Sequence, residues 1–189
     1  MKFISRGLSC RVAYWAVGLT LMGSLYGAAW AKTAQEINSS VDACLTRFYR
    51  EVNGGREAAA RAKGVLVMPD VLKAGFIVGG EYGQGALRVG GKTDSYYNLA
   101  SGSVGLQIGG EDRDIVILFM TDEALQKFKA GKGWEAGVDA DVAVVTAGAG
   151  KTADLAKMND PIVAYVFDVK GLMADISLKG AKFTKISPA

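Results

Sequence analysis

The spacing of apolar residues divides the chain into a helical N-terminal part and a strand-rich remainder. Between residues 33 and 52, apolar side chains recur at the spacing of one helix face: Ile37, Val41, Cys44, Leu45, Phe48 and Val52. Thr33 and Glu36 form a capping-box signature at the start of this pattern, and an Asn-Gly-Gly sequence ends it. An alanine-rich stretch at 56–63, followed by Gly64, predicts a second short helix.

From residue 65 onward, short apolar runs are separated by glycine-rich segments. The runs that predict strands joined by tight turns cover residues 65–68, 76–78, 86–89, 96–100 and 104–108. Apolar and polar residues alternate in the third and fifth of these runs, as expected for a sheet with one covered face. Residues 115–120 are apolar without alternation, which predicts a central strand that is buried on both sides.

The rest of the chain adds two predicted helices and further strands. The predicted elements are a helix at 122–130, a strand at 138–144, a loop at 147–160 with a short helix at 153–158, and strands at 162–167 and 172–178. Thr121 is a suitable N-cap for the helix at 122–130, and Gly131 is its terminator. The pattern predicts an α+β fold, in which a glycine-rich, antiparallel curved sheet or partly closed barrel carries N-terminal helices and one short helix after the central strand.

The first 31 residues predict a cleavable secretion signal. Three basic residues and no acidic residue occur in the first eleven positions, and residues 12–31 carry no charge and end in Ala29-Trp30-Ala31. An uncleaved membrane anchor is the alternative, because about 20 uncharged residues can span a bilayer. The glycines in the run and the small residues at its end favour cleavage. We therefore expect residues 32–189 to form one domain in an extracytoplasmic compartment, the bacterial periplasm or cell envelope.

Loss of this signal changes the charge of the chain. The signal removes three of the 22 basic residues, which leaves 19 basic residues against 19 acidic ones. A formally neutral domain gives no reason to expect nucleic acid as a partner. Cys44 becomes the single cysteine, and its place in a helical apolar stripe favours a buried, inert thiol over a link between two chains.

The residue types disfavour an enzyme. The chain contains no histidine, which removes the commonest general base and the commonest zinc ligand. The sequences GAGKT at 148–152 and GGKT at 90–93 imitate a phosphate-binding loop, but Val145 and Ala86 stand where that loop needs its first glycine. We therefore predict a non-enzymatic protein without catalytic residues or cofactors.

Clusters of charged residues are predicted to be solvated. Residues 111–114 are expected to form a polar hairpin turn, and Asp139 and Asp141 to point into solvent from a strand rather than to bind calcium. Six basic residues are candidates for contact with anionic lipid: Arg47, Arg50, Arg56, Arg61, Lys63 and Lys73. Each basic residue near an anionic surface contributes about 1 kcal/mol. The alternative is that the apolar stripe of the first helix is core and its arginines keep it soluble.

Several ordered blocks of sequence resemble a known family. Five blocks resemble those of the SYLF domain, also called the Ysc84 actin-binding or DUF500 family, and they occur in the same order. They cover residues 62–69, 73–85, 102–110, 114–120 and 170–180. The resemblance covers essentially all of residues 32–189. Met173 and Asp175 differ from the phenylalanine and glycine that many members have at these positions.

The resemblance implies a lipid-binding module, with phosphoinositide recognition and membrane or actin-cytoskeleton roles in eukaryotic members. It supplies no catalytic residues. An exported protein would not meet cytosolic actin, so we expect binding of anionic lipid or phosphoinositide-type headgroups at a membrane surface. The alternative is a structural or protein-interaction module of the cell envelope that has a protein partner and no lipid ligand.

Overall fold

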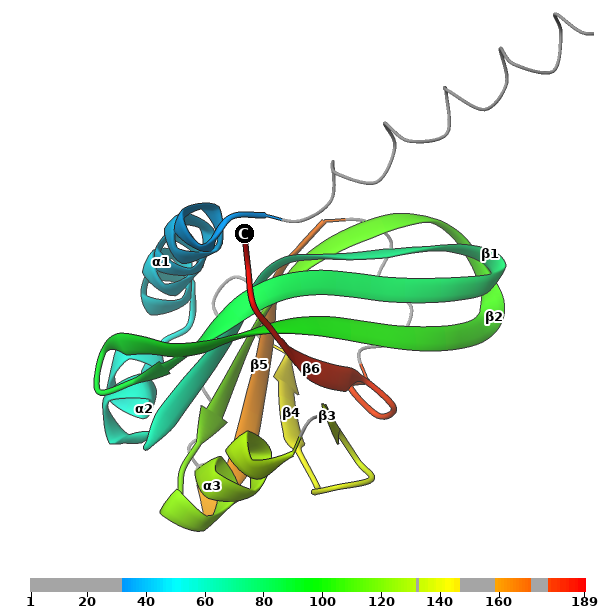
Figure 1. Cartoon of the computed structure of the whole chain (residues 1–189). Helices are drawn as coiled ribbons and strands as arrows, with labels where there is room; N and C mark the ends of the chain where they lie inside the picture. Colours follow the sequence, from blue (N-terminus) through cyan, green and yellow to red (C-terminus); the bar gives the residue numbers. More distant parts are fainter. Residues whose placement is uncertain (1–31, 132, 147–158, 171–176) are drawn as a thin grey trace, which may run out of the picture. The chain divides into compact units, whose positions relative to one another are not determined.

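Two long, bent strands form the centre of the fold (Figure 1). The computed structural model describes residues 32–131, 133–146, 159–170 and 177–189. Strand β1 covers Gly64–Val89, strand β2 covers Lys92–Phe119, and the two pair antiparallel along nearly their whole length. Gly90 and Gly91 form the turn between them, with φ angles of 58° and 78° that residues with a side chain rarely adopt.

The hairpin folds back on itself midway along its two strands (Figure 1). The second half of β1 then lies against the first half, and two glycines allow the close approach. A Cβ atom at Gly85 would lie 1.9 Å from the carbonyl oxygen of Val67, and one at Gly83 would lie 2.8 Å from Cγ2 of Val71. Glycine at these two positions is therefore required by close packing of the two halves rather than by a turn.

Four shorter strands complete a six-stranded sheet. β2 pairs with β6 (Lys182–Ile186) along its first half and with β5 (Ile162–Lys170) along its second half. β3 (Gly133–Glu135) extends the sheet beyond β6, and β4 (Ala143–Thr146) pairs parallel with β5. The predicted α+β class with a curved, partly closed sheet is confirmed, and the parallel β4–β5 pair makes the sheet mixed rather than purely antiparallel.

Three helices cover the sheet, close to where the pattern predicted them. α1 covers Ala34–Glu51, α2 covers Gly55–Arg61 and α3 covers Asp122–Ala130. The capping box of Thr33 and Glu36 is present at the start of α1, and Thr121 caps α3. Within the part of the chain that the structure describes, no helix is both long and apolar enough to span a bilayer.

The sheet separates two hydrophobic cores because alternate residues of its central strands point to opposite faces. One core contains the apolar stripe of α1 together with residues such as Val67, Val116 and Val163. The other contains Phe128 of α3 and residues such as Leu66. Ile37, Val41, Cys44 and Phe48 of α1 are all fully buried. The interpretation of this stripe as core is therefore confirmed, as is the buried state of Cys44.

The strand boundaries differ from the prediction. The runs predicted as separate strands are parts of β1 and β2, so tight turns between them are wrong except at 90–91. Their glycines serve the bend and the close packing of the hairpin instead. The hairpin turn predicted at 111–114 is also wrong, because this segment lies within β2 and Arg113 and Asp114 are 1% and 2% exposed.

The strand predicted at 138–144 is largely wrong as well. Val138 lies in a turn and is 68% exposed, and strand pairing begins only at Ala143. Asp139 is exposed, as predicted, but in that turn, where its side chain accepts a hydrogen bond from the backbone N–H of Glu135. The predicted short helix at 153–158 and most of the predicted strand at 172–178 lie outside the described residues.

Candidate functional site

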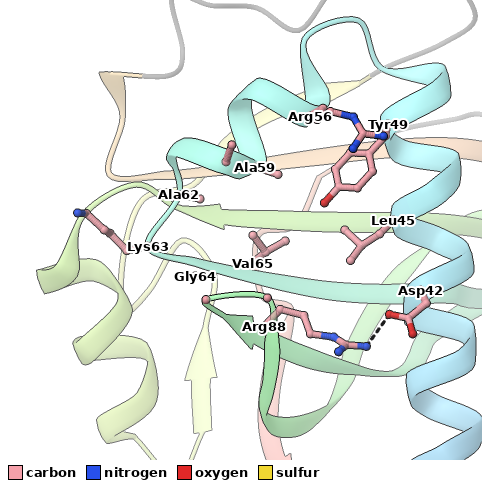
Figure 2. A pocket seen from close by; sticks show the side chains of 13 residues that line it. Asp42, Leu45, Tyr49, Arg56, Ala59, Ala62, Lys63, Gly64, Val65 and Arg88 are labelled. Carbon is pink, nitrogen blue, oxygen red and sulfur yellow. Dashed lines mark hydrogen bonds and ion pairs between the residues drawn. The ribbon is translucent and has the colours of Figure 1, made fainter.

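A pocket of about 530 Å³ opens between α1, α2 and the turn of the β1–β2 hairpin (Figure 2). Its lining comes from both helices, from both ends of β1 and from the turn: Asp42, Leu45, Tyr49, Arg56, Ala59, Ala60, Ala62, Lys63, Gly64, Val65, Arg88, Gly90 and Gly91. The floor is made of small and apolar side chains. Charged side chains surround it, three of them cationic and one acidic.

The three cationic side chains lie at different sides of the pocket (Figure 2). Arg56 stacks on Tyr49, with its guanidinium carbon 4.7 Å from the ring centroid, which holds the charge in a fixed place. Lys63 lies at the opposite end, where its side chain is 51% exposed and its Nζ is 3.8 Å from Asp122 of α3. An anion in the pocket would therefore meet positive charge from Arg56 of α2 and Arg88 at the end of β1, while the ammonium group of Lys63 points away from them (Figure 2).

The third cation, Arg88, is held by Asp42 of α1. Nη2 of Arg88 donates to Oδ1 of Asp42 at 2.7 Å. The arginine side chain is 15% exposed, whereas the aspartate side chain is 67% exposed. Nε of Arg88 is buried and has no hydrogen-bond partner within the described part of the chain. Arg88 thus has donor capacity that its single carboxylate partner does not use.

Polar contacts fix the hairpin against α1 and so fix the pocket. Oγ1 of Thr93 donates to Oδ1 of Asn38 at 2.7 Å, and Nδ2 of Asn38 donates to the hydroxyl of Tyr96 at 2.8 Å. These bonds join the N-terminal part of α1 to the first residues of β2. The wall that carries Arg88 therefore stays in place independently of its ion pair with Asp42.

Two of the six basic residues predicted from the sequence, Arg56 and Lys63, line this pocket. Arg50 lies elsewhere on α1, where its side chain is 68% exposed and pairs with Glu51 at 2.7 Å. Arg61 is exposed in the last turn of α2 and does not line the pocket. Contact of these four residues with lipid stays a prediction. In the structure, Arg56 and Lys63 line the pocket, whereas Arg50 and Arg61 lie on the exposed surface outside it.

Arg47 lies within a cluster of carboxylates that joins α1 to the sheet. It is 2.7 Å from Asp114, 3.4 Å from Asp168 and 3.9 Å from Asp70. Burial, and next the negative charge of Asp114, raise the pKa of the neighbouring Cys44 thiol far above its ordinary value. A guanidinium with three carboxylate neighbours is positioned to anchor the helix, and its role in lipid contact stays a prediction.

Lys73, the sixth residue, belongs to a charged network inside the fold. Its side chain is 11% exposed and its Nζ lies 3.6 Å from Glu81. Glu81 also accepts a hydrogen bond from Nη2 of Arg113 at 2.6 Å, and the side chain of Arg113 has no exposed surface. The network stabilises the folded-back hairpin, because Lys73 and Arg113 come from opposite strands and Glu81 comes from the returning half of β1.

Sequence reasoning missed three residues of the pocket: Asp42, Tyr49 and Arg88. Asp42 and Arg88 are separated by 46 positions in the sequence, so no local motif contains both. The available signal was weak: Arg88 occupies a polar position of an alternating run just before two glycines, and Asp42 lies on the polar side of a helix. Only the fold brings them together.

The arrangement suits the binding of an anion. Guanidinium groups present several donors in one plane and match phosphate or carboxylate oxygens, while an aromatic ring supplies apolar contact area. The described residues contain no group of three or more histidine, cysteine, aspartate or glutamate side chains that could hold a metal ion.

Comparison with known proteins gives the family. The model of the Ysc84 family, described as "Las17-binding protein actin regulator", matches residues 100–188. SH3 domain-containing YSC84-like protein 1 of Pongo abelii is 33% identical over 127 residues, which cover 65% of this chain and 37% of that protein. The Homo sapiens protein of the same name is 32% identical with the same coverage.

A bacterial relative matches a larger part of the chain. Beta cell expansion factor A of Aeromonas veronii is 32% identical over 160 residues, which cover 80% of this chain and 58% of that protein. This chain thus spans little more than a third of the animal relatives and somewhat over half of the bacterial one. The family description names a binding protein and regulator, and the family supports a lipid-binding or interaction domain in general. The resemblance seen in the sequence is confirmed: the Ysc84 (SYLF) family model matches residues 100–188, and a bacterial relative is similar over 80% of this chain.

Proposed function

We propose that residues 32–189 form a non-enzymatic domain that binds the anionic headgroups of lipids at a membrane surface. The domain acts outside the cytoplasm, in the bacterial periplasm or cell envelope, after removal of residues 1–31. One observation carries this proposal: the pocket between α1, α2 and the hairpin turn combines Arg56, Lys63 and Arg88 with the ring of Tyr49.

The charges of the pocket set the strength of the interaction. Three cationic side chains and one carboxylate leave a net charge of +2 around the cavity. A basic residue near an anionic surface contributes about 1 kcal/mol, so the pocket contributes about 2 kcal/mol, or roughly a 30-fold increase in affinity. Because the side chains of Lys63 and Asp42 are more than half exposed, salt will screen a large part of this energy. The affinity is therefore modest and sensitive to salt.

The burial of the apolar stripe of α1 supports contact with the membrane through polar groups. An amphipathic helix that inserts into a bilayer places its apolar face among the lipids. The apolar stripe of α1 is instead buried against the sheet. The folded domain therefore meets the membrane through its charged side chains, and a bilayer without anionic lipid offers it little.

Vesicle co-sedimentation tests the proposal with residues 32–189, which contain both hydrophobic cores and form a unit separate from residues 1–31. We expect binding to vesicles with anionic lipid at low salt, weaker binding at moderate salt, and none to purely zwitterionic vesicles. Arg56→Gln and Arg88→Gln should each weaken binding about fivefold. Arg50→Gln removes the same charge from an exposed site outside the pocket and serves as the matched control.

Two outcomes would contradict the proposal. If Arg50→Gln weakens binding as much as Arg56→Gln, binding depends on diffuse surface charge and not on the pocket. If the domain binds no vesicle at all, the alternative gains weight, a structural or protein-interaction module of the cell envelope without a lipid ligand. The family description names actin regulation, but an exported domain would not meet cytosolic actin.

A further inference from the structure

We infer that Asp42 sets the ligand selectivity of the pocket. Its carboxylate pairs with Arg88, and a phosphate monoester can displace this carboxylate whereas a phosphate diester cannot. The inference rests on the proposed function, because it concerns the same pocket. Asp42 is the one acidic residue among the thirteen that line the cavity. It therefore competes directly with any anionic ligand for the positive charge there.

The two partners of the ion pair differ in how firmly they are held. Arg88 belongs to a β-strand, its side chain is 15% exposed, and its Nε is buried. Asp42 lies on a helix surface with its side chain 67% exposed, and its carboxylate has only the 2.7 Å contact to Arg88 among the described residues. Asp42 can turn into solvent at little cost, whereas Arg88 remains in the wall of the pocket.

The release of Arg88 leaves the pocket intact. The bonds from Asn38 to Thr93 and Tyr96 continue to hold the hairpin against α1. A ligand oxygen can then accept from Nη2 of Arg88 in place of the carboxylate. Tyr49 and Arg56 are already fixed on each other, so no further rearrangement is required.

Charge decides which ligand can displace Asp42. A phosphate diester carries one negative charge and would only replace one monoanion with another at Arg88. A phosphate monoester carries a charge of about −1.5 to −2 at neutral pH and has three strong acceptor oxygens. It can replace the carboxylate at Arg88 and still attract Arg56. Asp42 thus weakens the binding of phosphate diesters more than the binding of phosphate monoesters, although lipids of both kinds are anionic.

The test compares two lipids with wild-type protein and Asp42→Asn. Vesicles of phosphatidylcholine carry either phosphatidate, a monoester, or phosphatidylglycerol, a diester, at matched surface charge. We expect the wild type to prefer phosphatidate. Asp42→Asn should bind phosphatidylglycerol about two- to fivefold more tightly, the range for an exposed ion pair, and should lose most of the preference. Asp112→Asn makes the same change at an exposed residue of β2 outside the pocket and should behave as wild type.

The outcomes separate this inference from the proposed function. If Asp42→Asn keeps the wild-type preference while Arg88→Gln weakens binding to both lipids, the selectivity role is wrong and the pocket stands. If Arg88→Gln and Arg56→Gln both bind as wild type, the proposed function itself is wrong. Titration calorimetry with inorganic phosphate shows whether the pocket binds free phosphate or the phosphate of a lipid headgroup. If the protein binds phosphate saturably but binds to no vesicle, the assignment of the ligand as a lipid headgroup is wrong.

Discussion

Replacement of Gly85 by alanine tests the fold-back of the central hairpin. The added Cβ would lie 1.9 Å from the carbonyl oxygen of Val67, 2.9 Å from its carbonyl carbon and 2.7 Å from Sδ of Met68. Two of these three atoms belong to the backbone, so a rotamer change cannot relieve the contact. The two halves of β1 must separate by about 1 Å or more to admit one methyl group.

The cost follows from the kind of contact. Overpacking of a core by a methyl group costs typically about 1–3 kcal/mol, and contact with rigid backbone places Gly85→Ala at the upper end. For a domain of this size, about 3 kcal/mol corresponds to a decrease in Tm of about 6–12 °C. Gly83→Ala should cost less, because its Cβ meets a side-chain methyl group of Val71 at 2.8 Å.

Thermal unfolding followed by circular dichroism measures these changes. Gly110→Ala is the matched control, since this glycine also lies in the hairpin but has nothing within 4 Å of its added Cβ. We expect the control to stay within about 1 kcal/mol of the wild type. If Gly85→Ala and Gly110→Ala melt at the same temperature, the halves of β1 are not in contact and the fold-back is wrong.

Two further predictions concern buried ionisable groups. Arg113→Met should lower the free energy of unfolding by about 3 kcal/mol in urea denaturation, because Glu81 stays buried and keeps only Lys73, at 3.6 Å, as a cationic partner. Addition of Glu81→Gln should recover part of this loss, and equal stability of the single and double variants would contradict the argument. Burial raises the pKa of Cys44 above its ordinary 9.0, so the folded state keeps a proton that the unfolded chain releases. Stability from this group is complete below about pH 9 and falls by about 1.4 kcal/mol per unit above it. The stability difference between wild type and Cys44→Ala should therefore shrink as the pH rises, and a constant difference would contradict the assignment.

The helices could be predicted from the sequence because their signals are local. The capping box of Thr33 and Glu36 and the apolar spacing that follows lie within a few turns of one another, and α1 begins one residue after Thr33. The helix at 122–130 was predicted with the bounds that the structure has. Each of these elements depends on interactions over three or four positions, which a single sequence records directly.

The course of the hairpin could not be predicted in the same way. Its glycines were interpreted as turns, since a turn is the commonest reason for glycine between apolar runs. Gly85 is required instead by contact with Val67, eighteen positions earlier in the chain. Arg113 was placed in solvent for a related reason: its partner Glu81 is 32 positions away, and the sequence around Arg113 looks like a charged turn.

The pocket shows the same limit on a functional surface. Arg56 and Lys63 were selected because they lie close together in a basic stretch, and both line the cavity. Arg47 and Lys73 were selected on the same evidence, yet the fold pairs Arg47 with the buried Asp114 and Lys73 with the buried Glu81. Net charge along the sequence therefore identifies the region, while pairing with distant acids decides which cations are free to meet a ligand.

The burial of the α1 stripe also limits how the domain can meet a membrane. Insertion of α1 would bury its own apolar stripe again in lipid, but it would expose the sheet face beneath the helix, with residues such as Val67, Val116 and Val163, at roughly 1.5–3 kcal/mol for each side chain. The charges of the pocket contribute only about 2 kcal/mol. Insertion of α1 into lipid would therefore unfold the domain, whereas headgroup contact leaves it intact. Vesicle binding that resists high salt should be accompanied by loss of the native circular dichroism spectrum, and salt-resistant binding with a native spectrum would refute contact through the pocket alone.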